Sequence, residues 1–280
     1  MFVWEKGVSR REFLQSCLGA LGAAGFSSLV FVRCTTTPTG KKAFILISEE
    51  EETKLGESAF TEIMAQEKPS KNKRQADLLR KVGQRIAAVS HRPDHRWQFE
   101  LIASEQVNAF ALPGGKVAFY EGIMPFCQNE AGIACVMGHE VGHVAARHGA
   151  QRISQQLAVQ GALTAVDLSV TRNSKNRNVI LGALGVGATL GVLLPYSREH
   201  EYEADKLGLM YMAKAGYDPE EAVLFWERFA ELSKGQPKVP EFLSTHPMSE
   251  NRVREMRKNL PEAKRLYDAA PVKYGKGETV

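Results

Sequence analysis

Two histidines and a glutamate lie close together in the stretch GHEVGHVAARH, residues 138–148. On an α-helix, side chains four positions apart lie on the same face, one turn from each other. His139 and His143 can therefore direct their imidazoles at one metal ion, and Glu140 can reach a water molecule beside that ion. The alternative is that both histidines make ordinary contacts in a helical core. The mid-helix position and the apolar neighbours favour the metal site.

A catalytic zinc site needs a third protein ligand and one open position. In the pattern H-E-x-x-H-x-x-G-x-x-H, the third ligand is a histidine ten residues after the first. Here that position is Gly149, and Ala146 stands where the pattern has glycine, so this pattern does not apply. We interpret the nearby His148 as a polar residue close to the helix end.

The later segment PYSREHEYEADKLG, residues 195–208, offers another third ligand. Glu201 and Asp205 lie four positions apart and share one helical face. In this scheme Glu201 binds the metal, and Asp205 holds the free ring nitrogen of a metal-binding histidine, which fixes its tautomer and orientation. Glu199 and Glu203 lie on other faces, and we interpret them as solvated carboxylates.

The ordered motifs HEVGH, SREHEYEAD and STHP resemble metallopeptidase family forty-eight. That family includes CAAX-prenyl proteases, heat-shock membrane proteases and exported bacterial lipoproteins that act in outer-membrane quality control. The stretches NAFALPGGKVAFYEGI and TGKKAFILISEEEE are similar to the exported, lipoprotein-like branch. The resemblance covers about residues 35–258. No set of long membrane helices is visible in the sequence, which argues against the integral-membrane branch.

The resemblance implies one zinc ion per chain, with His139, His143 and Glu201 as its ligands. It implies that Glu140 is catalytic, and it places His246 of STHPMSENRVREM beside the zinc. There His246 could occupy the open position in a self-inhibited resting state, which we favour, or it could stabilise the oxyanion. Without the resemblance, His246 would be interpreted as a loop histidine that caps the next helix. Arg252 is a weaker candidate for the same role.

Helices are expected to position most of these side chains. Ser48 and Glu51 predict a capping box at the start of a helix, and the acidic run there suits a helix N-terminus better than a metal site. Apolar residues spaced by three and four predict a second helix over about 72–90. Asn129 is expected to cap the helix of the first motif. Nearly all of the chain from about 121 to 260 is predicted to be helical.

A small sheet is predicted before the motif helix. RWQFELIA, VNAFAL and KVAFYEG have strand character, and the last two form a hairpin at Pro113–Gly115. The expected fold is α+β: a predominantly helical zincin-type metallopeptidase domain with a small antiparallel sheet. An extended substrate chain is expected to pair with the exposed edge of the strand near Asn108 to Leu112.

The first 34 residues differ from the rest, and we expect them to be an export signal. Arg10 and Arg11 precede an apolar run and resemble a twin-arginine signal; the alternative is an anchor that is never cut. Cys34 ends this segment and resembles the acylation site of bacterial lipoproteins. Arg33 stands where such sites usually have a small residue, so lipid modification and a simple linker both fit.

The rest of the chain is expected to divide into a linker (35–47), the zinc metallopeptidase domain (48–260) and a peripheral C-terminal segment (261–280). The apolar core of residues 178–195 is shorter than the roughly 20 residues that span a bilayer, so we expect a buried or interface-facing helix. Cys127 and Cys135 could form a disulfide in an exported protein, but we expect two buried thiols.

These features together predict a zinc-dependent endopeptidase of the bacterial cell envelope. We expect it to be exported, either periplasmic or anchored to the membrane through its N-terminus, and to degrade misfolded or unassembled envelope proteins. The net charge of +4 and the scattered basic residues give no nucleic-acid-binding stripe. The alternative is a chaperone or outer-membrane assembly factor with a largely latent protease site. A purely structural zinc site is disfavoured, because such sites are usually cysteine-rich and closed.

Overall fold

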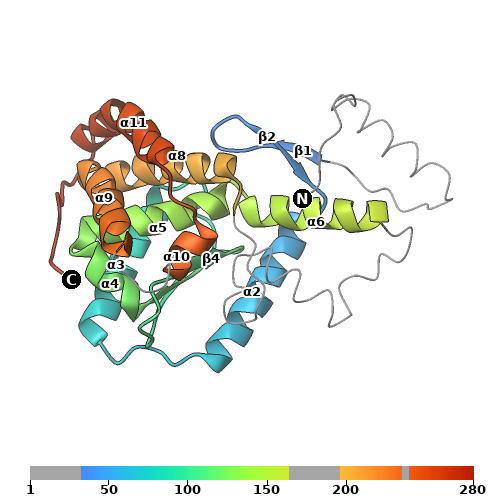
Figure 1. Cartoon of the computed structure of the whole chain (residues 1–280), viewed down its shortest axis with the longest axis horizontal. Helices are drawn as coiled ribbons and strands as arrows, with labels where there is room; N and C mark the ends of the chain where they lie inside the picture. The colour runs from blue at the N-terminus through green and yellow to red at the C-terminus, as the bar shows by residue number, and fades with distance from the viewer. Residues whose placement is uncertain (1–32, 164–195, 235–239) are drawn as a thin grey trace.

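The computed structural model describes residues 33–163, 196–234 and 240–280 (Figure 1). The helices are α2 (Glu49–Gln66), α3 (Lys73–Val89), α4 (Met124–Cys127), α5 (Glu130–Ala145), α6 (His148–Leu163), α8 (Arg198–Lys214), α9 (Glu220–Lys234), α10 (Glu241–Thr245) and α11 (Glu250–Asp268), with the 3₁₀ turn η1 (Glu121–Ile123). The strands are β1 (Arg33–Thr36), β2 (Lys42–Ile45), β3 (Gln98–Ile102), β4 (Ala109–Leu112) and β5 (Lys116–Tyr120). The predominantly helical α+β fold expected from the sequence is confirmed.

Polar side chains fix the starts of the helices. Ser48 and Glu51 form the predicted capping box of α2. The side chain of Asn129 accepts a hydrogen bond of 2.9 Å from the backbone N–H of Gly132 at the start of α5. Ser197 caps α8 in the same way. These caps satisfy backbone N–H groups that a helix start would otherwise leave without partners.

The three-stranded sheet has the order β3-β5-β4. The predicted hairpin of β4 and β5 is present, and these two strands are antiparallel. The third strand differs from expectation, because β3 pairs with β5 in parallel and the sheet is mixed. Residues 103–108 carry the chain past the position of β5, so that β4 forms on the far side and not next to β3.

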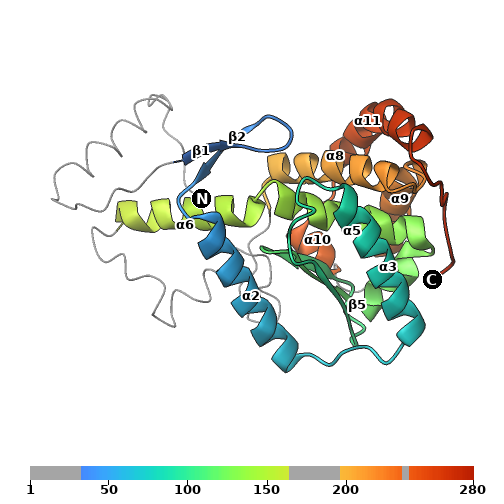
Figure 2. The ribbon, with the colours of Figure 1, turned by 180° about the vertical axis from the view of Figure 1, so that it is seen from behind.

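Helices cover both faces of this sheet (Figures 1 and 2). Alternate strand residues point to opposite faces. One face joins the large core formed with α3 and α5, through Phe99, Leu101, Val117 and Phe119. The other face packs against Phe60 and Ile63 of α2, through Phe110, Leu112, Ala118 and Tyr120. The sheet is therefore buried between α2 on one face and α3 and α5 on the other.

Helices α5 and α8 lie side by side and touch through glycines (Figures 1 and 2). All residues of α5 are buried. A Cβ atom on Gly138 would lie 2.7 Å from the carbonyl oxygen of Gly208, and one on Gly208 would lie 2.7 Å from the backbone nitrogen of His139. Only glycine allows the two backbones to approach so closely. This contact brings side chains of the two helices within reach of one centre.

The expected linker at residues 35–47 is largely folded. Strands β1 and β2 form an antiparallel hairpin, in which Cys34 is the partner of Phe44. Ala43 and Ile45, alternate residues of β2, are buried with Ala150 of α6. This short alternation of apolar residues acquires its buried face only in the tertiary structure.

Helix α11 spans residue 260, where the sequence analysis placed the end of the peptidase domain. Helix α11 continues through Pro261, and Ala263 beyond it is fully buried. The C-terminal residues then pair with the start of α5: the N–H of Glu130 donates to the carbonyl of Glu278 at 2.9 Å. The expected peripheral segment is thus attached to the peptidase core. A proline removes only one helical hydrogen bond, and here packing outweighs that loss.

Cys127 and Cys135 are free and buried, as predicted. The greater part of the expected export signal and the apolar stretch 178–195 lie outside the described residues. Among the helices that the structure describes, none is both long and apolar enough to cross a bilayer.

Candidate active site

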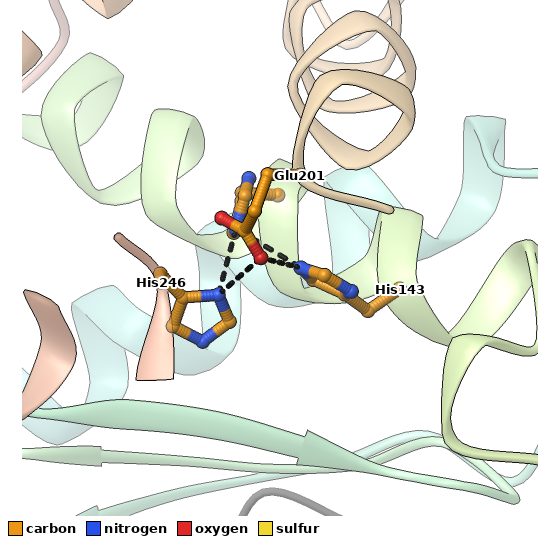
Figure 3. A group of neighbouring side chains, drawn as sticks. His143, Glu201 and His246 are labelled. Atoms are coloured by element: carbon orange, nitrogen blue, oxygen red, sulfur yellow. Dashed lines mark hydrogen bonds and ion pairs between the residues drawn. The ribbon is translucent and has the colours of Figure 1, made fainter. Parts of the chain in front are cut away.

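Four side chains from three separate segments converge at the centre of the molecule (Figure 3). His139 and His143 come from α5, Glu201 from the first turn of α8, and His246 from the residue after α10. One nitrogen or carboxylate oxygen from each lies within 4.8 Å of the others, and all four residues are buried. The structure thus brings together the three predicted metal ligands and the histidine expected beside them.

Five of the six separations between these atoms are close to those of a tetrahedral metal site. Nε2 of His139 lies 3.1 Å from Nε2 of His143 and 3.1 Å from Nδ1 of His246. The carboxylate oxygens of Glu201 lie 3.2 to 3.5 Å from these three nitrogens. Zinc with bonds of roughly 2.0–2.1 Å requires ligand atoms about 3.3 Å apart at the corners of a tetrahedron. The residues present therefore fit a zinc ion.

Asp205 lies where the sequence placed it, behind a metal-site histidine. Its Oδ1 is 2.9 Å from Nδ1 of His139, the ring nitrogen that faces away from the cluster. Such a contact fixes the tautomer and leaves Nε2 available to a metal. Burial alone would raise the pKa of Asp205, but the Arg252 guanidinium and His139 lower it, so the carboxylate remains ionised.

Arg252 does not occupy the position proposed for it from the sequence. Its guanidinium donates two hydrogen bonds of 2.7 Å to Asp205 and lies 2.8 Å from Glu201. It also donates to the backbone carbonyls of His246 and Pro247. These contacts hold the guanidinium of Arg252 against the carboxylates of Asp205 and Glu201. Arg252 therefore supports the site electrostatically and does not face the open position.

The second histidine of the motif has a different support. Nδ1 of His143 lies 2.9 Å from Nδ1 of His148, and Nε2 of His148 lies 3.5 Å from Glu203. Both His148 and Glu203 are buried. The interpretation of Glu203 as a solvated carboxylate was wrong, because the loop between β1 and β2 covers it with Thr37 and Thr39. Glu199, by contrast, is exposed as predicted.

Glu140 is buried beside the ligand cluster, with one carboxylate oxygen 3.4 Å from Nε2 of His246. Burial raises the pKa of Glu140, while His246, His139 and the backbone N–H of Ala111 act in the opposite direction. A raised carboxyl pKa suits a group that must first accept a proton and then release it. Ala111 belongs to β4, so Glu140 lies between the cluster and this strand.

Strand β4 is an edge strand of its sheet among the described residues, as expected for a substrate-pairing strand. Its residues are all buried, however, so the expected exposed edge is not present in this state. A small cavity of about 10 Å³ is lined by residues that include Ala111, His143 and Tyr196.

The ionisation of the cluster differs from one ligand to the next. Burial holds the pKa of His143 well below its ordinary value, so this imidazole is neutral. Burial acts on His139 in the same direction, but hydrogen bonds with Asp205 and Glu201 outweigh it and raise the pKa to about 9. For Glu201, Arg252 and His246 outweigh the effect of burial and keep the pKa well below the ordinary value.

The sequence analysis did not identify a further support of the site, the aromatic ring of Tyr196. The ring of Tyr196 stacks on His143 with a centroid distance of 3.9 Å and on His246 with 5.3 Å. The guanidinium of Arg152 lies on Tyr196, 4.1 Å from the ring centroid. Tyr196 directly precedes Ser197, the cap of α8, but no spacing rule links a tyrosine there to a histidine on another helix.

A helical H-E-x-x-H pair, a carboxylate from a second helix and a buried glutamate beside them define a metallopeptidase of the zincin type. Comparison with known families agrees, because residues 72–260 match peptidase family M48. The chain belongs to peptidase family M48 and is a metalloprotease.

Relatives occur in both mitochondria and bacteria. The mitochondrial metalloendopeptidase OMA1 of Schizosaccharomyces pombe is 35% identical over 262 residues, which cover 91% of this chain and 74% of the relative. OMA1 of Saccharomyces cerevisiae is 37% identical over 62% of this chain and 50% of its own length. The beta-barrel assembly-enhancing protease of Escherichia coli is 29% identical over 64% of this chain and 37% of its own length. The matches thus do not single out the lipoprotein-like branch.

Proposed function

We propose that this protein is a zinc-dependent endopeptidase that cleaves misfolded or unassembled proteins of the bacterial cell envelope. The observation that supports the proposal most strongly is the buried set of His139, His143, Glu201 and His246, whose ligand atoms have tetrahedral spacing, with Glu140 beside it. Structural zinc sites are usually rich in cysteine, whereas this set has none. Catalytic sites also need a general base.

The chemistry is divided between the metal and the chain. A bound zinc ion would lower the pKa of a water molecule and polarise the scissile carbonyl. Glu140 accepts a proton from the attacking water and delivers it to the leaving amine. Asp205 holds the ring of His139, and Arg252 keeps Asp205 and Glu201 ionised. An extended substrate would pair with β4, and this pairing would place the backbone of the substrate beside Glu140.

His246 is proposed to close the site in its resting state. Its Nδ1 lies 3.1 Å from Nε2 of His139 and 3.2 Å from Glu201, at the fourth corner of the ligand set. A metalloprotease needs that corner for water and substrate. His246 must therefore leave before cleavage, and the buried state of β4 is consistent with the same closed form.

The activity is tested with purified full-length protein, loaded with zinc and incubated with unfolded casein. We expect cleavage that stops with a zinc chelator and returns when zinc is added. A Glu140→Gln variant serves as the control for contaminating proteases. Zinc binding without cleavage, even for the His246→Ala variant, would instead support the chaperone or assembly-factor alternative.

The envelope location is also a proposal. It is supported by the basic pair Arg10 and Arg11 before an apolar run, and by similarity to a protease named for beta-barrel assembly. Replacing both arginines with lysine in a bacterial host should retain the precursor in the cytoplasm, as measured by cell fractionation. Continued export of the double variant would indicate the general secretory route.

A further inference from the structure

A line of buried polar contacts joins His143 to the hairpin formed by β1 and β2. His143 Nδ1 lies 2.9 Å from His148 Nδ1, and His148 Nε2 lies 3.5 Å from a carboxylate oxygen of Glu203. The other oxygen of Glu203 accepts hydrogen bonds from the hydroxyls of Thr37 and Thr39. The hairpin precedes the region that matches the family, which begins at residue 72.

The arrangement of protons in this line follows from the metal site. Nε2 of His143 faces the cluster, so a metal bound there leaves the ring proton on Nδ1. That N–H needs an acceptor, and Nδ1 of His148 is the atom within reach. His148 must then carry its own proton on Nε2, which faces Glu203. Each ring nitrogen thus has one defined role, and Glu203, 3.5 Å away, is the carboxylate that faces the N–H of His148.

Glu203 depends on the hairpin for its hydrogen bonds. It is 3% exposed, and a buried carboxylate is costly unless it is hydrogen-bonded. Thr37 and Thr39 supply hydroxyl donors, and the ammonium group of Lys41 lies 3.6 Å away. All three residues belong to the loop between β1 and β2 or its edge. Removing this loop would take these donors away from the Glu203 carboxylate, which faces His148.

His139 and His143 are therefore held by different sets of side chains. The support of His139, Asp205 with Arg252, lies within α8 and α11. The support of His143 comes from α6, α8 and the hairpin. The two halves of one metal site thus depend on segments far apart in the sequence.

We propose that His148 and Glu203, held by Thr37 and Thr39, are positioning residues for the metal ligand His143, and that the hairpin is consequently a functional part of the zinc site. The inference rests on the metal site proposed above. It assigns to the hairpin a role in metal affinity that goes beyond packing.

The test measures zinc affinity by competition with a chromophoric chelator, and ligand geometry by the visible absorption of the Co²⁺-substituted full-length protein. We expect His148→Ala and Glu203→Ala to weaken zinc binding by roughly 10- to 100-fold and to shift the Co²⁺ bands. His148→Asn should recover much of the affinity, because the asparagine oxygen can accept the hydrogen bond from His143 in place of the imidazole nitrogen. The matched control is Glu199→Gln, which removes an exposed carboxylate from the same helix and should change neither readout.

A double variant, Thr37→Val with Thr39→Val, tests the hairpin without altering the helices, and it keeps the test decisive if Glu203→Ala does not fold. We expect about a tenfold loss of zinc affinity. Folded variants that lose thermal stability but keep the wild-type affinity and Co²⁺ spectrum would overturn the inference and leave the metal site intact. A wild-type protein that binds no zinc would contradict the proposed function itself.

Discussion

Arg252 donates two hydrogen bonds of 2.7 Å to the two carboxylate oxygens of Asp205, in the buried interior of the protein. The same carboxylate lies 2.9 Å from the ring of His139. One ion pair thus links α11 to a metal ligand on α5 through α8. Removing one partner of a buried ion pair leaves the other charge uncompensated, which is usually more harmful than replacing both.

Asp205→Ala should therefore lower both zinc affinity and stability. We expect affinity to fall roughly 10- to 100-fold, less than for Glu201→Ala, which removes a ligand. The free energy of unfolding should fall by up to about 3–5 kcal/mol, because Arg252 loses both hydrogen bonds to Asp205 and keeps Glu201 as its remaining carboxylate partner. Asp205→Ala with Arg252→Met should recover part of the stability, measured by urea denaturation, but not the affinity; recovery is incomplete because Glu201 also loses its contact with Arg252. Recovery of the affinity in the double variant would mean that Asp205 acts through stability alone.

Glu140→Gln should retain zinc and lose peptidase activity. Glutamine keeps the shape of the side chain but cannot accept the proton from water, and loss of a general base costs about 10²- to 10⁴-fold in rate. Metal content and casein turnover are measured on the same sample. Loss of zinc would show that Glu140 is structural, and unchanged turnover would remove it from the mechanism.

Zinc binding at pH 7 should release about one proton, as expected when a metal displaces a ligand proton. In the metal-free protein His139, with a pKa of about 9, is protonated at pH 7, whereas His143 is neutral and Glu201 is ionised. Affinity should therefore rise about tenfold per pH unit from pH 7 towards pH 9 and then level off. Calorimetry in buffers of different ionisation enthalpy counts the proton. The Asp205→Ala variant should release fewer protons on zinc binding, because the substitution removes a group that raises the pKa of His139. Equal proton release by the variant and the wild type would exclude His139 as the source of the proton.

His246→Ala should increase peptidase activity while zinc is retained. His246 occupies the fourth corner of the ligand set, and its removal opens that corner to water. Steady-state kcat and KM are compared at equal zinc content. A lower kcat at full zinc content would assign His246 to oxyanion stabilisation instead.

The sequence was sufficient to predict which candidate site residues share a helical face. The spacing of His139 and His143 on one helix, and of Glu201 and Asp205 on another, follows from helical geometry alone. The caps Ser48 and Asn129 were predicted from local chemistry, and both are confirmed.

The contacts between distant segments could not be predicted in the same way. No rule of helical spacing distinguishes Glu203 from Glu199. Glu203 is buried beside His148 because the hairpin of β1 and β2 covers it, and that contact is visible only in the structure. The strand order, with β5 between β3 and β4, depends on sheet packing and not on the turn at Pro113–Gly115. Arg252 was noticed, but its partners are set by the way α11 crosses α8.

The contact between Gly138 and Gly208 sets the distance between α5 and α8, the two helices that carry three of the four candidate metal ligands. Gly208 lies seven residues from Glu201, about 10 Å along the helix axis. A methyl group on Gly208 would lie 2.7 Å from the backbone of α5 and would force the two helices apart. Ligand distances, in contrast, must hold to about 0.2 Å. One added carbon at this contact between the helices can thus change the metal affinity while every ligand is still in place. Substitutions at Gly138 or Gly208 therefore offer a way to adjust that affinity without changing a ligand.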